Sequence, residues 1–196
     1  MGNSWKVAER KVARLLGKWA CGNEDALRRM PLQGRMMEEY LGDIIVNETA
    51  PEDVRKKGAA FLNKFMIDVK KRITKQSATG WHFEQFLTSP KHQIFAWWRK
   101  LEGAAKKYQK MPLLIITKGD RNWFMLISEK LYNSSTWPNR SLVDAPRSPW
   151  PDNQIYVRCG GLALMAFNLF DFLKMPAEAI WPAEPAASVE SSPEQA

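Results

Sequence analysis

One apolar run limits the possible folds of this chain more than any other feature: FMIDVKKR, residues 65–72. Successive side chains of a β-strand point to opposite faces of a sheet. Phe65 and Ile67 therefore share one face of the predicted strand, and Asp68 and Lys70 share the other. The run predicts a strand whose first face enters a hydrophobic core and whose second face holds an acid and an amine side by side.

Other elements precede and follow this strand. Apolar side chains at helical spacing predict helices over residues 4–19 and 91–108, and short apolar runs bounded by turn residues predict further strands. The strands are expected at 42–46, 112–118, 123–128 and 154–158, with a buried helix at 160–173, a short helix within 49–63 and an irregular segment at 21–41. This order predicts an α/β (α+β) fold, in which helices flank a mixed central β-sheet.

The chain length of 196 residues suits one domain. We expect a single domain over residues 1–175, with a core at 4–128 and a C-terminal extension at 129–175. Residues 176–196 contain four glutamates, four prolines and no basic residue, which is typical of a disordered acidic tail.

Charge indicates the class of partner. The net charge is +8, so without its acidic tail the chain carries +12, and a body this basic favours polyanions such as nucleic acid. No apolar run approaches the roughly 18 residues that a membrane span needs, and we expect a cytoplasmic protein. Two cysteines and two histidines give no disulfide framework and no metal-binding pattern.

A second acid, Asp43, starts the short apolar run GDIIV. Adjacent strands lie about 4.8 Å apart, so Asp43 and Asp68 can converge on one cation if their strands are neighbours. Two carboxylates with open positions for water are the environment that Mg²⁺ prefers. Lys70 would lie beside them, and Glu9, at the edge of the apolar stripe of helix 4–19, can complete the acidic cluster.

This order of elements resembles the PD-(D/E)xK nuclease superfamily, and more narrowly the Holliday-junction-resolvase-like endonucleases of phages and archaea. The resemblance covers residues 4–128 and rests on six segments: SWKVAERKVARLL, RRMPLQG, GDIIV, FMIDVKKR, HQIFAWWRKL and PLLIITKGDRNWFMLI. The acid of the acid-x-lysine motif is Asp68 here, where resolvases more often have glutamate.

The resemblance implies a role for each matching residue. Glu9, Asp43 and Asp68 are expected to bind Mg²⁺, for which Mn²⁺ can substitute, with Lys70 as the catalytic lysine and Gln93 beside the site. The implied activity is Mg²⁺-dependent hydrolysis of DNA phosphodiester bonds, selective for branched structures. Paired cuts in a junction require two sites, so we expect a homodimer, with the apolar helix at 160–173 as the contact.

Two basic groups flank the expected site. Arg28, Arg29 and Arg35 precede Asp43, and Lys71, Arg72 and Lys75 follow Lys70, so both groups are candidates to bind DNA phosphates. No base-reading motif is present, and we expect recognition through backbone and shape.

Simpler interpretations remain open for each residue. Asp68 can be an edge-strand acid paired with Lys70, Asp43 can close a turn, and Glu9 and Gln93 can be solvated surface residues. The alternatives at the level of function are a restriction-type or repair-type nuclease on the same fold, and a DNA-binding protein that retains the fold without catalysis.

Overall fold

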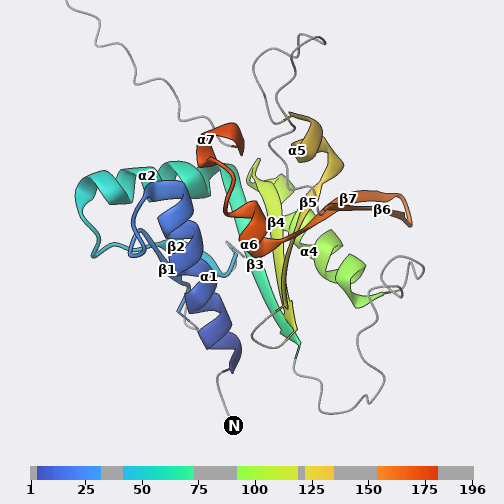
Figure 1. Ribbon diagram of the computed structural model, residues 1–196, viewed down its shortest axis with the longest axis horizontal. Coiled ribbons are helices and arrows are strands. Elements are labelled where there is room, and N and C mark those ends of the chain that lie inside the picture. The colour runs from blue at the N-terminus through green and yellow to red at the C-terminus, as the bar shows by residue number, and fades with distance from the viewer. Residues whose placement is uncertain (1–3, 32–41, 73–91, 119–121, 135–153, 181–196) are drawn as a thin grey trace, which may run out of the picture.

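The computed structural model describes residues 4–31, 42–72, 92–118, 122–134 and 154–180 (Figure 1). The helices in these ranges are α1 (Ser4–Cys21), α2 (Glu52–Lys64), α4 (Gln93–Lys107), α5 (Glu129–Ser134), α6 (Leu169–Phe172) and α7 (Ala177–Ile180). Helices α1, α2 and α4 confirm the predictions from the apolar spacing.

A five-stranded sheet with the strand order β3-β4-β5-β7-β6 occupies the centre of the structure. Strand β4 runs parallel to β3, and the other neighbouring strands are antiparallel, so the sheet is mixed as predicted. Its strands are β3 (Phe65–Arg72), β4 (Met111–Lys118), β5 (Asn122–Ser128), β6 (Gln154–Cys159) and β7 (Leu162–Asn168). Helix α4 makes the crossover between the parallel strands β3 and β4, which cannot be joined by a tight turn.

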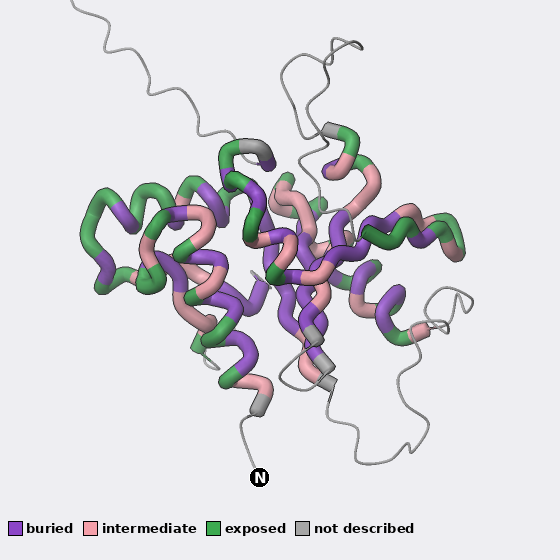
Figure 2. Tube along the Cα trace, in the orientation of Figure 1, coloured by how far each residue is buried: buried purple, intermediate pink, exposed green. Residues whose placement is uncertain are grey.

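Both faces of this sheet are covered by helices. Ile67 and Ile115 belong to the core that includes α1, α2 and α6, whereas Met66 and Leu114 belong to a second core with α4. Figure 1 shows α1 and α2 on one side of the sheet and α4 on the other. The central strands are buried, while the outer face of α2 and much of β6 are exposed (Figure 2).

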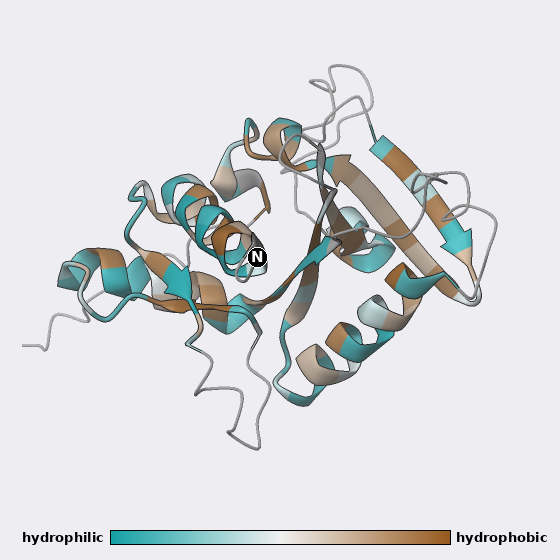
Figure 3. Ribbon diagram, turned by 90° about the horizontal axis from the view of Figure 1, so that it is seen from below, coloured by the Kyte–Doolittle hydropathy of each residue, from teal (hydrophilic) through white to brown (hydrophobic). Residues whose placement is uncertain are grey.

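Helix α1 is amphipathic, and its pattern explains how it packs. Ala8, Val12 and Leu16 recur every four residues and are all buried. In Figure 3, hydrophilic and hydrophobic residues alternate along the ribbons of the helices. Burial of this apolar stripe sets the rotation of α1 about its axis and therefore fixes the direction of every other side chain on it.

A separate two-stranded sheet carries the residues on the N-terminal side of the site. Strand β1 (Leu27–Arg29) pairs antiparallel with β2 (Ile44–Val46). The prediction that 21–41 is irregular was wrong for β1, because a three-residue strand is too short to show periodicity in the sequence. Residues 32–41 lie outside the described part of the chain.

The predicted buried helix at 160–173 was also wrong. Most of this segment is strand β7, which pairs with β5 on one side and β6 on the other, and only Leu169–Phe172 form a helix. A strand buried in a sheet and a buried helix both give continuous apolar runs, so periodicity alone does not separate them. The side chains of Leu164 and Phe167 are buried in the two cores, and this segment is therefore not an apolar helix that can form a dimer contact.

The C-terminal part of the described chain corrects one further prediction. Helix α7 lies inside the segment 176–196 that the composition predicts to be disordered. Ala177 and Ile180 are buried, and Ile180 belongs to the core beside α1 and α2. These few apolar side chains suffice to hold one helical turn at the start of the segment.

Candidate active site

Asp43 joins the two sheets. It immediately precedes β2, and its backbone N–H donates to the carbonyl of Ile67 at 2.8 Å, while its own carbonyl accepts from the N–H of Met30 at the same distance. Its carboxylate Oδ2 accepts a further hydrogen bond, 2.8 Å long, from the backbone N–H of Val69. Backbone and side chain of Asp43 thus both bind the edge of β3, on either side of Asp68.

Gly42 makes this close approach possible. Its φ of 94° lies in a region that L-residues with a side chain rarely adopt. A Cβ at this position would also lie only 2.7 Å from the carbonyl oxygen of Ile67. The glycine before Asp43 is therefore part of the site, a role that the sequence analysis did not recognise, although the Gly-Asp pair at the start of a strand was visible.

Asp68 and Lys70 point to one side of β3, as the alternation predicted. Lys70 Nζ is 2.5 Å from Asp68 Oδ1, whereas Ile67 and Val69 belong to the core on the other face. Asp68 is 4% exposed, and its carboxyl group lies close enough to that of Asp43 to raise the pKa of Asp43. The two acids from different strands therefore meet, with the ammonium group of Lys70 beside them.

The environment of this pair disfavours two negative charges. Burial, the hydrogen bond to Asp68 and the charge of Asp68 together raise the pKa of Asp43 to about 8, against the opposing effects of the Val69 N–H and Lys70. Two touching carboxylates at neutral pH must therefore share a proton or gain additional positive charge. Hard oxygen ligands in this arrangement fit a divalent cation such as Mg²⁺, which is commonly bound by only one or two protein carboxylates.

Glu9 reaches the vicinity of the two-stranded sheet but has a basic neighbour. Its carboxylate is 3.6 Å from the guanidinium of Arg29, and both side chains are largely buried. The same guanidinium lies 5.8 Å from the ring centre of Trp5. Within the described ranges, no three His, Cys, Asp or Glu side chains are close enough to share a metal ion, so the contact between acids is a pair, Asp43 with Asp68.

Comparison with known families decides the classification. The family model described as "Phage putative PDDEXK endonuclease" matches residues 3–145, well over half of the chain. The chain belongs to this phage PD-(D/E)xK endonuclease family. No curated protein and no solved structure matches the chain.

Membership of the PD-(D/E)xK endonuclease family confirms the predicted superfamily and the nuclease class of the protein. The mixed five-stranded sheet with helices on both faces is consistent with the restriction-endonuclease-like fold, which the sequence also predicted. The described residues contain no helix with the length and apolar character of a membrane span.

Gln93 is the first residue of α4 and is exposed. Because α4 connects the parallel strands β3 and β4, its N-terminus lies toward the C-terminal end of β3, where Asp68 and Lys70 are found. The topology is compatible with the place that the PD-(D/E)xK resemblance gives to this glutamine, but among the described residues no contact joins Gln93 to the acids.

The basic residues near the site divide into two groups. Arg28 and Arg29 lie on β1, where Arg28 pairs with Glu48 at 3.7 Å and Arg29 with Glu9. Lys71 is half-buried near the end of β3, and Arg72 is the last residue of that strand. Arg35 and Lys75 lie outside the described residues.

The remaining candidates for chemistry have structural roles. Cys21 is buried, and burial raises the pKa of its thiol to about 11, so it is not a nucleophile at neutral pH. His92 caps α4, with its side chain accepting from the N–H of Ile94 at 3.3 Å. Trp98 is fully buried in the core beneath α4 and does not offer a stacking surface.

Proposed function

We propose that this protein is a divalent-metal-dependent DNA endonuclease, with Mg²⁺ as its usual cofactor and Mn²⁺ as a possible substitute. One observation carries the proposal: the buried side chains of Asp43 and Asp68 meet at the edge of β3, where Asp43 Oδ2 accepts from the Val69 N–H at 2.8 Å and Lys70 Nζ lies 2.5 Å from Asp68 Oδ1. An acid pair with an adjoining lysine can hold a divalent cation next to a phosphate and offset the charge that develops there. The family membership of the chain supports this assignment.

The two acids and Lys70 have different tasks in this reaction. Asp43 and Asp68 would hold the divalent cation, which when bound would supply charge neutralisation at the phosphate and lower the pKa of water. Lys70, whose side chain is 30% exposed, can reach a phosphate and offset the charge that develops on its oxygens. The oxygen of a water molecule bonds to phosphorus, one P–O ester bond breaks, and the proton of the water passes to solvent or to the leaving oxygen.

Glu9 is proposed as a third acid of the site, and Gln93 as a group beside it. For Glu9 the route is through Arg29, because the phosphates of DNA compete directly for guanidinium groups, and loss of that ion pair on DNA binding would remove one partner of the Glu9 carboxylate. In this arrangement, Arg29 both binds DNA and controls the charge around the acids.

Arg28, Arg29, Arg35, Lys71, Arg72 and Lys75 are proposed to bind the DNA backbone on either side of the acids. Within the described ranges, Arg28 pairs with the exposed Glu48 at 3.7 Å, an interaction worth little against a phosphate. Such contacts position the DNA without reading its sequence, which suits an enzyme that selects a DNA structure, such as a four-way junction.

Resolution of a junction needs two sites, and a homodimer supplies them. Because β7 occupies the sheet, a dimer contact must use another surface. The edge strand β6 carries exposed apolar side chains, Ile155 at 37% and Tyr156 at 44%. An edge strand with exposed apolar residues readily pairs with a second chain, so β6 is the proposed contact.

A cleavage panel tests the proposed function. Purified protein is mixed with a four-way junction, a flap, a single strand and a linear duplex, each with Mg²⁺, with Mn²⁺ and with EDTA. We expect metal-dependent cutting, loss of cutting but not of binding in Asp68→Asn, and unchanged cutting in the control Asp171→Asn, a half-buried acid on α6 that pairs with Lys174. Preference for the junction with paired nicks selects a resolvase, and equal cutting of duplex selects a restriction-type or repair-type enzyme.

Binding of DNA by the wild-type protein without cutting of any form would instead assign the chain to non-catalytic DNA-binding proteins. Inactivity of Asp68→Asn has a meaning only if the variant is folded, so its circular dichroism and thermal melting are compared with those of the wild type.

A further inference from the structure

The outer face of α1 borders a groove of about 530 Å³ that the proposed active site does not use. Four cationic residues line it: Arg10, Lys11, Arg14 and Lys18. With 100° of rotation per residue, the last three lie about 140–180° around the helix from Glu9. Glu9 is 2% exposed and faces the protein, whereas the four cations are exposed. The groove is therefore a surface distinct from the acid pair.

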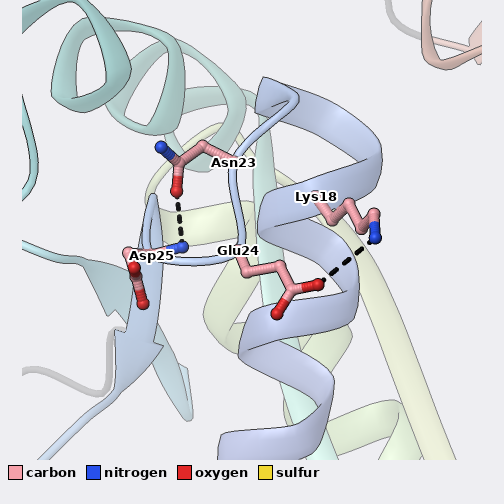
Figure 4. Close-up of polar contacts among 4 residues, drawn as sticks. All are labelled: Lys18, Asn23, Glu24 and Asp25. Atoms are coloured by element: carbon pink, nitrogen blue, oxygen red, sulfur yellow. Dashed lines mark hydrogen bonds and ion pairs between the residues drawn. The ribbon is translucent and has the colours of Figure 1, made fainter.

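The charge of this groove is strongly positive. Its acidic lining residue, Glu24, lies at one end, where its carboxylate is 3.3 Å from Lys18 Nζ. Figure 4 shows Lys18 reaching from α1 to Glu24 on the following turn, which is held by a hydrogen bond from the Asp25 N–H to the Asn23 side chain. Both members of the ion pair are more than half exposed, so a phosphate can displace Glu24 at little cost.

The middle of the groove keeps its charge. Among the described residues, neither Arg10 nor Arg14 has a carboxylate partner. Lys11 lies over aromatic rings, with Nζ 5.2 Å from the ring centre of Trp123 and 5.6 Å from that of Phe170. These cation–π contacts orient the ammonium group without neutralising it.

The spacing of the cations matches an extended polyanion. Arg10, Arg14 and Lys18 recur every four residues, which separates them by about 6 Å along the helix axis. The whole row spans about 12 Å, the axial length over which one DNA strand presents three to four phosphates. A small anion would need convergent cations, and a second copy of the same basic face would be repelled.

We propose that this groove along α1 binds the phosphate backbone of a DNA segment away from the scissile phosphodiester. The assignment of DNA as the polyanion rests on the proposed function. A site on the opposite face of the helix that carries Glu9 would hold a second stretch of the substrate, such as another arm of a branched molecule. The groove thereby increases the affinity of the protein for DNA without taking part in the hydrolysis.

The main comparison of the test is between two double alanine variants of the full chain. Arg10→Ala/Arg14→Ala removes two groove cations, and Lys106→Ala/Lys107→Ala removes the same charge from the exposed end of α4, on the other side of the sheet. Binding of a labelled four-way junction is measured by fluorescence anisotropy in EDTA over a salt titration. Each phosphate contact contributes about 0.9 to the slope of log affinity against log salt.

We expect the groove variant to lower that slope by about 2 and to weaken binding about tenfold or more at low salt. Its kcat at saturating DNA should equal that of the wild type, because neither arginine touches the acid pair. Arg10→Lys/Arg14→Lys should keep the wild-type slope. An unchanged slope in the alanine variant, or equal losses in the groove and control variants, would overturn the proposal.

The groove proposal and the proposed function can be refuted independently of each other. If the wild type binds DNA but never cuts it with any metal, the hydrolase assignment is lost while a selective loss of binding in Arg10→Ala/Arg14→Ala still supports the groove. If the wild type cuts DNA and this variant binds normally, only the groove proposal is lost. Both are refuted if the wild type binds no DNA.

Discussion

Replacement of Asp43 by asparagine should stabilise the metal-free protein at alkaline pH, although it should destroy the proposed activity. The pKa of Asp43 is raised from 3.8 to about 8, chiefly by burial. A carboxyl whose folded-state pKa exceeds its unfolded value stabilises the fold fully below pH 4. That contribution disappears as the pH rises through about 8, because folding then requires a buried negative charge.

The magnitude follows from the interval between the two pKa values. It spans roughly four pH units, and each is worth about 1.36 kcal/mol, so the cost of ionising Asp43 approaches about 5 kcal/mol at pH 9. Asparagine avoids this cost. It has nearly the shape of a protonated aspartic acid, its oxygen can still accept from the Val69 N–H, and its amide can donate to Asp68.

Thermal and urea unfolding in EDTA, from pH 5 to pH 9, measures the effect. Asp43→Asn should exceed the wild type in stability by only about 1–2 kcal/mol at pH 5, which is about one pH unit above the unfolded pKa. At pH 9 the variant should be more stable by about 3–5 kcal/mol, which corresponds to a melting temperature about 10 °C higher. The exposed control Asp25→Asn should show no such divergence. Addition of Mg²⁺ at pH 9 should stabilise the wild type more than Asp43→Asn, because cation binding replaces the missing proton.

A variant less stable than the wild type by a constant amount at every pH would refute this reasoning. It would mean that Asp43 acts through its hydrogen bonds alone and that the acid pair does not carry excess negative charge.

Three further predictions concern other parts of the site. Gly42→Ala should destabilise the protein by about 2 kcal/mol or more in urea unfolding and should reduce Mg²⁺-induced stabilisation, because the new Cβ would collide with the Ile67 carbonyl. Lys70→Met should lower the cleavage rate about 100-fold or more in single-turnover assays while DNA affinity changes little, since the phosphate loses its nearest cation in the site. Ile155→Lys should shift the protein from dimer to monomer in analytical ultracentrifugation without changing its melting temperature; a wild type that is already monomeric would remove β6 as the contact.

Much of the site was predictable because it depends on short-range rules. The alternation of a strand places Asp68 and Lys70 on one face regardless of the rest of the fold, and their contact follows directly. The meeting of Asp43 with Asp68 needed one additional assumption, that their strands pair, and this assumption was wrong because β2 and β3 belong to separate sheets. Asp43 itself makes the connection, through its hydrogen bonds to Ile67 and Val69.

The features that sequence reasoning missed depend on contacts between distant segments. The sequence of β7 indicates a helix unless its pairing with β5 and β6 is known. The burial of Glu9 beside Arg29 depends on how α1 packs against β1, about 20 residues later, and no local pattern encodes that distance. The need for glycine at position 42 likewise arises only from the approach of a different strand.

The connection between the two sheets has a consequence for how this protein can lose or change its activity. The five-stranded sheet has a core of its own beside α4 and contains Asp68 and Lys70, whereas Asp43 arrives on the small sheet formed by β1 and β2, which contributes Leu27 and Ile44 to the other core. Mutations that only displace the two-stranded sheet would leave a folded protein in which Asp68 is in place but Asp43 no longer lies beside it. Inactive relatives could therefore arise by substitutions in β1, β2 or Gly42 while the acid-x-lysine strand stays intact. The presence of the acid-x-lysine motif alone is therefore poor evidence for catalysis.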